Sequence, residues 1–477
     1  MSEVKKSSKK SVDYTQGPLF SPFLKFGIAI LISNLAQSFY NTADNIVIGK
    51  YSGDENALAA ISSTSSLYSL LITAIICMSV GNMIVLARAH GEKDNKKISD
   101  ILHTSVAFAL VAGIAMSVIG QFVSMPILKL LNTKPELIDK AYEYISIIFW
   151  GLPFSFVSSY SDSALRSRGK GGVSTAVIVA SGVLNVGLNI LFVAGLGMSV
   201  SGVAIATVIS QAFSAVTILV ILSRDDPEIA FNPRKLGIKF AVLVEFLKIG
   251  LPNGIQSILA SLSSLITTTT LNSLPIDSLR ANAVARSATL ILGYICSSFT
   301  VSAVSVVVAQ NYGAKNFGRI IRIMLYSAMT FTAIMLVVTP IYLIFPSAVL
   351  SLFADAETEN YGALIELGIP LVILNILVYF MTGLYYIFAS TSRSLGHSMT
   401  PLLVSIGGTI FSVGWCLFVF PKIGTPMSYF IYPPITSLLN LLVIAGIVLF
   451  YLVRVRRECN TSSEAATADG ELADGEV

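Results

Sequence analysis

The stretch FLKFGIAILISNLAQSFYNTADNIVI, residues 23–48, is long and apolar enough to cross a bilayer, and it carries a carboxylate near its end. At 1.5 Å per residue it spans roughly 39 Å as a helix, against ~30 Å of hydrocarbon. A carboxylate is costly at bilayer depth, so Asp44 indicates a functional site that faces a cavity or a partner. The alternative is that Asp44 reaches water, since Lys50 and the helix end are close.

Asp44 shares one helix face with Gln37, Tyr40 and Asn41, because the four residues are spaced i, i+3, i+4 and i+7. This pattern predicts an ion- or proton-binding role for Asp44. Gln37, Tyr40 and Asn41 are predicted to line the same site and to contact a substrate.

The whole chain has the composition of a membrane protein. Its 477 residues are 54% hydrophobic and 12% charged, about half the charge of an average soluble domain. We expect an all-α membrane protein with twelve transmembrane helices. The predicted spans are 19–48, 56–84, 101–124, 138–160, 172–195, 200–222, 240–271, 281–309, 320–345, 362–388, 400–420 and 427–452.

Lys and Arg are distributed unevenly between the two predicted sides of the membrane. Of 31 such residues, 24 fall on the side of the N-terminus. By the positive-inside rule, both termini are predicted to be cytoplasmic in a multi-pass protein of the cell membrane. Because membrane orientation explains where the basic residues lie, the net charge of +4 does not indicate nucleic-acid binding. No cleavage site follows the first apolar run, so no signal peptide is expected.

Several function classes find no motif here. The sequence contains no Gly-x-x-x-x-Gly-Lys-[Ser/Thr] loop, which disfavours ATP-driven pumping. The four cysteines are scattered singly and suggest neither disulfides nor a metal site. The three histidines, His90, His103 and His397, lie near predicted loop ends and are expected to be solvated. No catalytic constellation can be assembled, so we expect neither an enzyme nor a bound cofactor.

Four short motifs recur along the chain in register. Leu24-Lys25-Phe26-Gly27 returns as Leu247-Lys248-Ile249-Gly250, and Arg166-Ser167-Arg168-Gly169 returns as Arg393-Ser394-Leu395-Gly396. Ala87–Lys93 and Gly151–Pro153 have similar counterparts at 309–315 and 368–370. Each half contains an even number of spans, so the pattern predicts two pseudo-symmetric six-helix bundles related as parallel repeats.

The predicted organisation follows from these repeats. It comprises a basic cytoplasmic tail (1–18), an N-lobe (19–222), a cytoplasmic linker (223–239), a C-lobe (240–452) and a disordered cytoplasmic tail (453–477). Two such bundles around a polar interior are typical of an alternating-access carrier.

Polar groups recur on one face of several N-lobe spans. Asn185 and Asn189 are spaced i, i+4, and Thr207 precedes Gln211 at the same spacing. These side chains indicate a shared wet cavity, although amides also act as hydrogen-bonding contacts between helices. Asp162 is a candidate coupling carboxylate, or else the partner of Arg166 in an i, i+4 ion pair.

The C-lobe differs, because the interior of its first span carries no carboxylate. Tyr379 and Tyr386 share a face of the span 362–388 and suit a broad site for flat organic molecules, or ordinary helix packing. Arg286 either faces a cavity or extends outward, and the sequence leaves this open.

These residues resemble the multidrug and toxic compound extrusion (MATE) family, and the resemblance covers nearly all of 19–452. Its motifs are Tyr40-Asn41-x-x-Asp44 with Gly49, Ala309-Gln310-x-x-Gly313-Ala314, Arg166-x-x-Gly169, and Gly197-x-x-x-x-Gly202-Val203-Ala204-x-Ala206-Thr207. The first motif is similar to the DinF-like branch. The resemblance implies a twelve-helix, two-lobe antiporter that expels organic cations in exchange for H⁺ or Na⁺.

The resemblance also assigns roles to residues. Asp44 matches the essential aspartate of that branch, Tyr40 a substrate-facing tyrosine, and Asn185 and Thr207 polar groups of the same pocket. Two positions depart from the pattern: Asn189 stands where the family has an aspartate, and Asp162 where it has an asparagine. Asp44, Asp162 and Asn189 are therefore our candidates for ion coupling, with the usual pair of aspartates in doubt.

We therefore expect a secondary active efflux antiporter for small organic cations that works in the lipid bilayer as a monomer. The alternative within carriers is a flippase for lipid-linked oligosaccharide, which needs a larger cationic cavity. A receptor or membrane enzyme is the alternative from another class, and the repeat argues against both.

Overall fold

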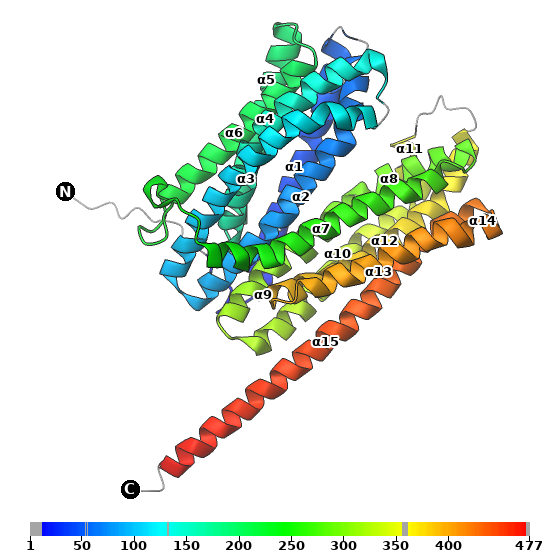
Figure 1. Cartoon of the computed structure of the whole chain (residues 1–477). Coiled ribbons are helices and arrows are strands. Elements are labelled where there is room, and N and C mark those ends of the chain that lie inside the picture. The colour runs from blue at the N-terminus through cyan, green and yellow to red at the C-terminus, as the bar shows by residue number, and fades with distance from the viewer. Residues whose placement is uncertain (1–11, 53, 55, 131–132, 355–360, 474–477) are drawn as a thin grey trace. The chain divides into compact units, whose positions relative to one another are not determined.

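The computed structural model describes residues 12–52, 54, 56–130, 133–354 and 361–473, and these are helical or loop without any strand (Figure 1). Two compact units divide the chain, Met1–Leu262 and Ser263–Val477. The first unit contains, in chain order, α1 (Phe20–Tyr51), α2 (Ala57–Glu92), α3 (Asn95–Leu130), α4 (Pro135–Ser167), α5 (Gly171–Asn189), the π-helical turn η1 (Ile190–Gly195), α6 (Val200–Ser223) and η2 (Pro233–Lys235).

Helix α7 (Phe240–Leu271) begins in the first unit and ends in the second. The second unit continues with α8 (Ile276–Ser297), η3 (Ser298–Ser302), α9 (Ala303–Gly313), α10 (Phe317–Ile344), α11 (Pro346–Ser351), α12 (Tyr361–Ser394), α13 (Met399–Gly414), η4 (Trp415–Val419), α14 (Phe420–Ile423) and α15 (Pro426–Ala473).

Within the described residues, 11 helical segments are long and apolar enough to cross a membrane. The remaining long helix is α4, which starts with charged residues and packs against α2, α3 and α6. It contains the predicted span 138–160. With α4 the segments number twelve, which confirms the predicted all-helical membrane fold.

The boundary between the units lies later than the linker predicted at 223–239, because the first half of α7 packs tightly on α2. A Cβ atom on Gly81 would lie 2.4 Å from the carbonyl oxygen of Phe246, and one on Gly250 would lie 2.4 Å from that of Met78. Asn253 Nδ2 also donates to the carbonyl of Cys77 at 2.7 Å. Two glycines thus let the helix backbones touch.

The backbone carries the internal repeat that the motifs predicted. Apart from Gly17, the described residues with positive φ occur in pairs at matching helix ends: Lys93 (57°) with Lys315 (58°), Gly169 (70°) with Gly396 (95°), and Gly197 (67°) with Gly424 (70°). Their separations, 222, 227 and 227 residues, match those of the motifs. The turns that end corresponding helices are therefore built alike in the two halves.

The C-terminal segment differs from its prediction. We expected residues 453–477 to be disordered, but α15 continues as far as Ala473, and only residues 474–477 lie outside the described part. The segment is rich in Ala and Glu, which have high helix propensity and extend a helix that is already formed. The absence of hydrophobic periodicity concealed this.

Buried charges tie the linker to the first unit where α3 begins and α4 ends. The Arg168 side chain is fully buried and donates to the Asp225 carboxylate, and Lys170 Nζ lies 3.0 Å from the same oxygen. Burial opposes ionisation of Asp225, but Arg168 and Lys170 outweigh it and hold the pKa of this carboxyl below its usual value.

His103, which we expected to be solvated, is also part of this contact. Its ring is only 3% exposed, stacks on Phe231 with centroids 5.7 Å apart, and accepts a hydrogen bond at Nε2 from the Asn232 backbone N–H at 3.0 Å. The prediction for His103 was wrong because the linker folds back over the start of α3.

Asp225→Asn should lower the stability of the protein at neutral pH. A carboxyl whose pKa is lowered by folding contributes stability above its unfolded pKa, and that stability is lost as the pH falls through the folded pKa. The substitution leaves Arg168 buried without a counter-charge, at a cost of about 3 kcal/mol. Thermal unfolding in detergent measures the effect. The neighbouring exposed Asp226→Asn is the control, and equal melting temperatures for the two variants would contradict the assignment.

Candidate functional site

Asp44 lies at one end of a hydrogen-bonded chain that joins three helices of the first unit. The half-buried Asp44 carboxylate on α1 accepts a hydrogen bond from Asn189 Nδ2 on α5. Asn189 Nδ2 also donates to Asn185 Oδ1 at 3.3 Å, and Asn185 Nδ2 lies 3.5 Å from Thr207 Oγ1 on α6. The predicted candidates Asp44, Asn185, Asn189 and Thr207 are therefore brought together.

Helix geometry explains why this chain forms. Asn185 and Asn189 lie one turn apart on the same face of α5, and both are buried, at 3% and 0% exposure. Asn189 is also the last residue before η1, and π-helical turns of this kind are frequent at functional sites. Asn189 Oδ1 is buried and has no hydrogen-bond partner among the described residues, so an acceptor remains free beside the carboxylate.

Three tyrosines, from α1, α2 and α4, lie near the carboxylate. Tyr40 lies one turn before Asp44 and packs against α5, where a Cβ atom on Gly182 would lie 2.8 Å from the ring. Tyr68 on α2 and Tyr144 on α4 lie within electrostatic range of Asp44. The site therefore combines one negative charge with tyrosines from three helices.

The sequence did not indicate Tyr68 or Tyr144 as members of the site. Tyr68 follows Thr64 at i+4, and Tyr144 follows Lys140 at i+4, but neither pattern points to Asp44. Their proximity to Asp44 depends on how α2 and α4 pack against α1. The only sequence signal was the presence of a tyrosine within or beside an apolar span.

The other two predicted residues of α1 have different surroundings. The side chain of Gln37 is half-buried and hydrogen-bonded to Tyr40. Asn41 is exposed. The four polar residues of this helix face therefore differ in exposure: Gln37, Tyr40 and Asp44 are half-buried, and Asn41 is exposed.

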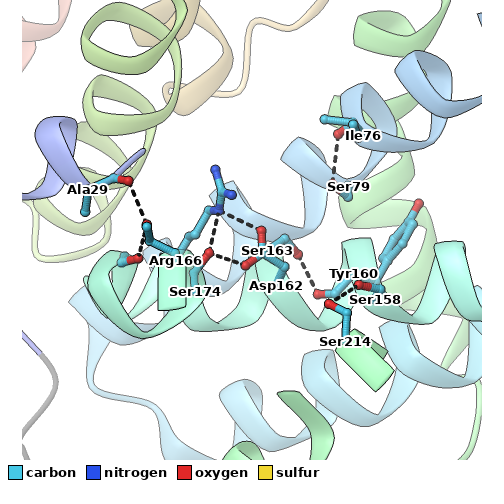
Figure 2. Close-up of polar contacts among 12 residues, drawn as sticks. Ala29, Ile76, Ser79, Ser158, Tyr160, Asp162, Ser163, Arg166, Ser174 and Ser214 are labelled. Atoms are coloured by element: carbon cyan, nitrogen blue, oxygen red, sulfur yellow. Dashed lines mark hydrogen bonds and ion pairs between the residues drawn. The ribbon is translucent and has the colours of Figure 1, made fainter. Parts of the chain in front are cut away.

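Asp162 forms the ion pair that was the alternative reading of its position (Figure 2). Its Oδ2 lies 2.7 Å from Arg166 Nε, and its Oδ1 accepts a hydrogen bond from Ser174 Oγ on α5. Arg166 Nε also donates to Ser174 Oγ at 3.2 Å. This cluster joins α4 to α5.

The ion pair lies far from Asp44. Tyr144, which is near Asp44, precedes Asp162 by 18 residues on α4, so the two are separated by about 27 Å of helix rise. Asp162 therefore does not replace the missing α5 carboxylate next to Asp44. Asn189 itself occupies that place, as a neutral hydrogen-bond donor.

The two predicted tyrosines of the C-lobe belong to the second unit, on α12. Tyr379 packs against α8, where a Cβ atom on Gly293 would lie 3.1 Å from the ring. The ring of Tyr386 lies 5.4 Å from that of Tyr385. The Asp44 site itself is built entirely from the first unit.

A twelve-helix membrane protein with repeated halves and an intramembrane carboxylate has the features of a polytopic carrier. Residues 29–191 and 252–417 match the family model MatE. The chain belongs to the MATE family of transporters.

Individual relatives agree with this assignment. The chain is 27% identical over 391 residues to the "Probable multidrug resistance protein YoeA" of Bacillus subtilis, covering 80% of this chain and 82% of that protein. It is 24% identical over 257 residues to the "Multidrug export protein MepA" of Staphylococcus aureus, covering 53% of this chain and 56% of MepA.

Solved structures share the fold. A structure described as the "Outward-facing conformation of a multidrug resistance MATE family transporter of the MOP superfamily" superposes with a TM-score of 0.85. The sequences are 19% identical, and the match covers 94% of this chain and 99% of that one. At this identity the similarity concerns the fold alone.

Asn189→Leu should weaken the binding of a lipophilic cation to the Asp44 site. It removes a hydrogen bond that stabilises the ionised carboxylate, the form a cation binds. Such a bond to a charged group is worth about 1.5–3 kcal/mol, which corresponds to roughly ten- to a hundredfold in affinity. Titration of the purified protein with tetraphenylphosphonium measures this.

Ser181→Ala is the control for Asn189→Leu, because it removes a neutral hydrogen bond between α5 and α6, from Ser181 Oγ to the carbonyl of Ser210 at 2.7 Å. If both variants bind the cation as the wild type does, the Asn189 contact has no role in binding.

Proposed function

We propose that this protein is a secondary active antiporter that expels small organic, mostly cationic, compounds in exchange for H⁺ or Na⁺. The observation that carries the proposal is the Asp44 carboxylate, which lies in a membrane-crossing helix, accepts a hydrogen bond from Asn189 and has Tyr68 and Tyr144 nearby. The printed names of the relatives, multidrug resistance and multidrug export proteins, support the substrate class.

Competition for Asp44 provides the coupling. An ionised carboxylate away from bulk water requires a positive partner, and a proton, a Na⁺ ion or the cationic group of a substrate each supplies one. One carboxylate with a single neutral donor does not hold two of these at once. Binding of the ion therefore releases the substrate, and binding of the substrate releases the ion.

The remaining residues of the site select the substrate. Aromatic faces at Tyr40, Tyr68 and Tyr144 attract organic cations through cation–π contacts. The polar groups of Gln37, Asn41, Asn185 and Thr207 accept or donate hydrogen bonds without adding charge. Such a site favours a positive charge and an aromatic body rather than one particular shape.

The energy of the ion gradient is sufficient for export. One proton that moves through ~150 mV releases roughly 3.5 kcal/mol, at about 2.3 kcal/mol per 100 mV. This sustains a concentration ratio of a few hundredfold for the substrate, at about 1.4 kcal/mol per decade. The proposal includes a location in the cell membrane with both termini in the cytoplasm, and a functional monomer.

The site in the first unit argues against the alternative of a lipid-linked oligosaccharide flippase. A pyrophosphate group requires cations, whereas the charge in this site is the carboxylate of Asp44. Tyrosine faces around a carboxylate suit an organic cation better than a polyanion.

Asp44→Asn should abolish the export of ethidium from proteoliposomes with an imposed ion gradient, while the variant still folds and inserts. The amide keeps the shape of the side chain but binds neither a proton nor a cation at neutral pH. Asp162→Asn is the matched control, because its carboxylate lies in the Arg166 ion pair. Export by Asp44→Asn at the wild-type rate would refute the proposal.

A further inference from the structure

Arg286 is an exposed residue of α8, at the edge of the helix face that packs against α12. Thr289 and Gly293 lie on the same helix face as Arg286, at i+3 and i+7. Thr289 Oγ1 accepts a hydrogen bond from Asn375 Nδ2 of α12 at 3.2 Å, and Gly293 is the residue against which the Tyr379 ring packs. The sequence left the direction of Arg286 open, and these contacts place it on the α12 side, where its side chain is exposed.

Tyr379 of α12 and Tyr432 of α15 both lie within electrostatic range of Arg286. Tyr432 is buried and hydrogen-bonded to Tyr429 and Thr267, which fixes its position. Asn282, one turn before Arg286, is half-buried on the same face.

Within the second unit, Arg286 forms no ion pair with an acidic side chain of residues 263–354 or 361–454. Among residues 263–354 and 361–454 the acidic side chains are Asp277 and Glu366, close to the starts of α8 and α12. Asp277 lies nine residues before Arg286 on α8, and Glu366 lies nine residues before Asn375 on α12, in each case about 13 Å of helix rise away. Among the described ion pairs none includes Arg286. An arginine in a membrane-crossing helix without a counter-charge indicates a functional site.

The internal repeat shows that the two units differ in charge at corresponding positions. Thr267 follows Asp44 by 223 residues, the separation of the motifs that open α1 and α7, and Cys416 follows Asn189 by 227, the separation of Gly169 and Gly396. Ser412 and Thr436, whose hydroxyls are 3.1 Å apart, link α13 to α15 much as Asn185 and Thr207 link α5 to α6. The second unit thus lacks the carboxylate, and the charge beside its polar cluster is positive.

We propose that Arg286, with Tyr379 and Tyr432, forms an anion-binding subsite in the second unit that takes the carboxylate of an aromatic acid. A guanidinium binds a carboxylate through two parallel hydrogen bonds. Tyrosine hydroxyls add donors, and their rings pack against an aromatic body. The subsite is separate from Asp44 and does not depend on ion exchange.

Binding of a matched pair of fluorescent probes to the purified protein, without any ion gradient, tests the proposal. Dansylglycine carries a carboxylate at neutral pH, and dansylglycinamide is its uncharged isostere, so micelle partitioning and ring stacking are common to both. The wild type should bind dansylglycine at least tenfold more tightly than the amide. Arg286→Gln should remove this difference, and Arg286→Lys should retain part of it.

Two controls separate the subsite from other effects. Arg280→Gln removes a positive charge from the same helix and should preserve the preference for dansylglycine. Asp44→Asn should also preserve it, so failure of the antiport proposal leaves this result unaffected. If Arg286→Gln does not fold, Tyr379→Phe and Tyr432→Phe serve instead and should each reduce the preference several-fold. Equal affinity of the wild type for both probes, or an unchanged preference in the Arg286 or tyrosine variants, would overturn the proposal.

Discussion

The cost of a negative charge in hydrocarbon governs the arrangement of the first unit. Asp44 is half-buried in a helix that crosses the membrane, and water cannot stabilise it there as it does on a surface. The structure compensates with the Asn189 amide, itself held by Asn185, and with tyrosines from α2 and α4. Four helices, α1, α2, α4 and α5, therefore contribute to the surroundings of one carboxylate, and none of the named groups is a fixed positive charge. A fixed cation would neutralise Asp44 permanently, and a mobile cation would then have no charge to bind.

The internal duplication repeats the backbone of the first unit in the second but not its side chains. Paired left-handed turns at Gly169 and Gly396, and at Gly197 and Gly424, show that both halves keep the same backbone plan. The side chains on that plan have diverged, since Thr267 stands where the repeat places Asp44 and Arg286 adds a positive charge nearby. The duplicated backbone is thus compatible with two sites of opposite polarity, one in each unit. Their chemistry differs although their helices correspond.

Hydropathy was sufficient to predict the twelve segments, because a bilayer requires long apolar helices and leaves few alternatives. The spacing of Asn185 and Asn189 was sufficient to place both on one face. The i, i+4 spacing of Asp162 and Arg166 predicted their ion pair as one of two alternatives. Tyr68, Tyr144 and the burial of His103 were beyond the sequence, since each depends on which helix or loop packs against it. The boundary inside α7 was also hidden, because it follows from the close approach of Gly81 to Gly250.

The central claim is that one carboxylate holds either an ion or a cationic compound, and proton release on binding measures this most directly. Tetraphenylphosphonium is added to purified protein in weakly buffered, Na⁺-free detergent solution, at a pH where the resting site is protonated, and the released protons are counted against the cation bound. The account predicts one proton per bound cation in the wild type and none in Asp44→Asn. Saturable binding without proton release in the wild type, or the same release in Asp44→Asn, would contradict it.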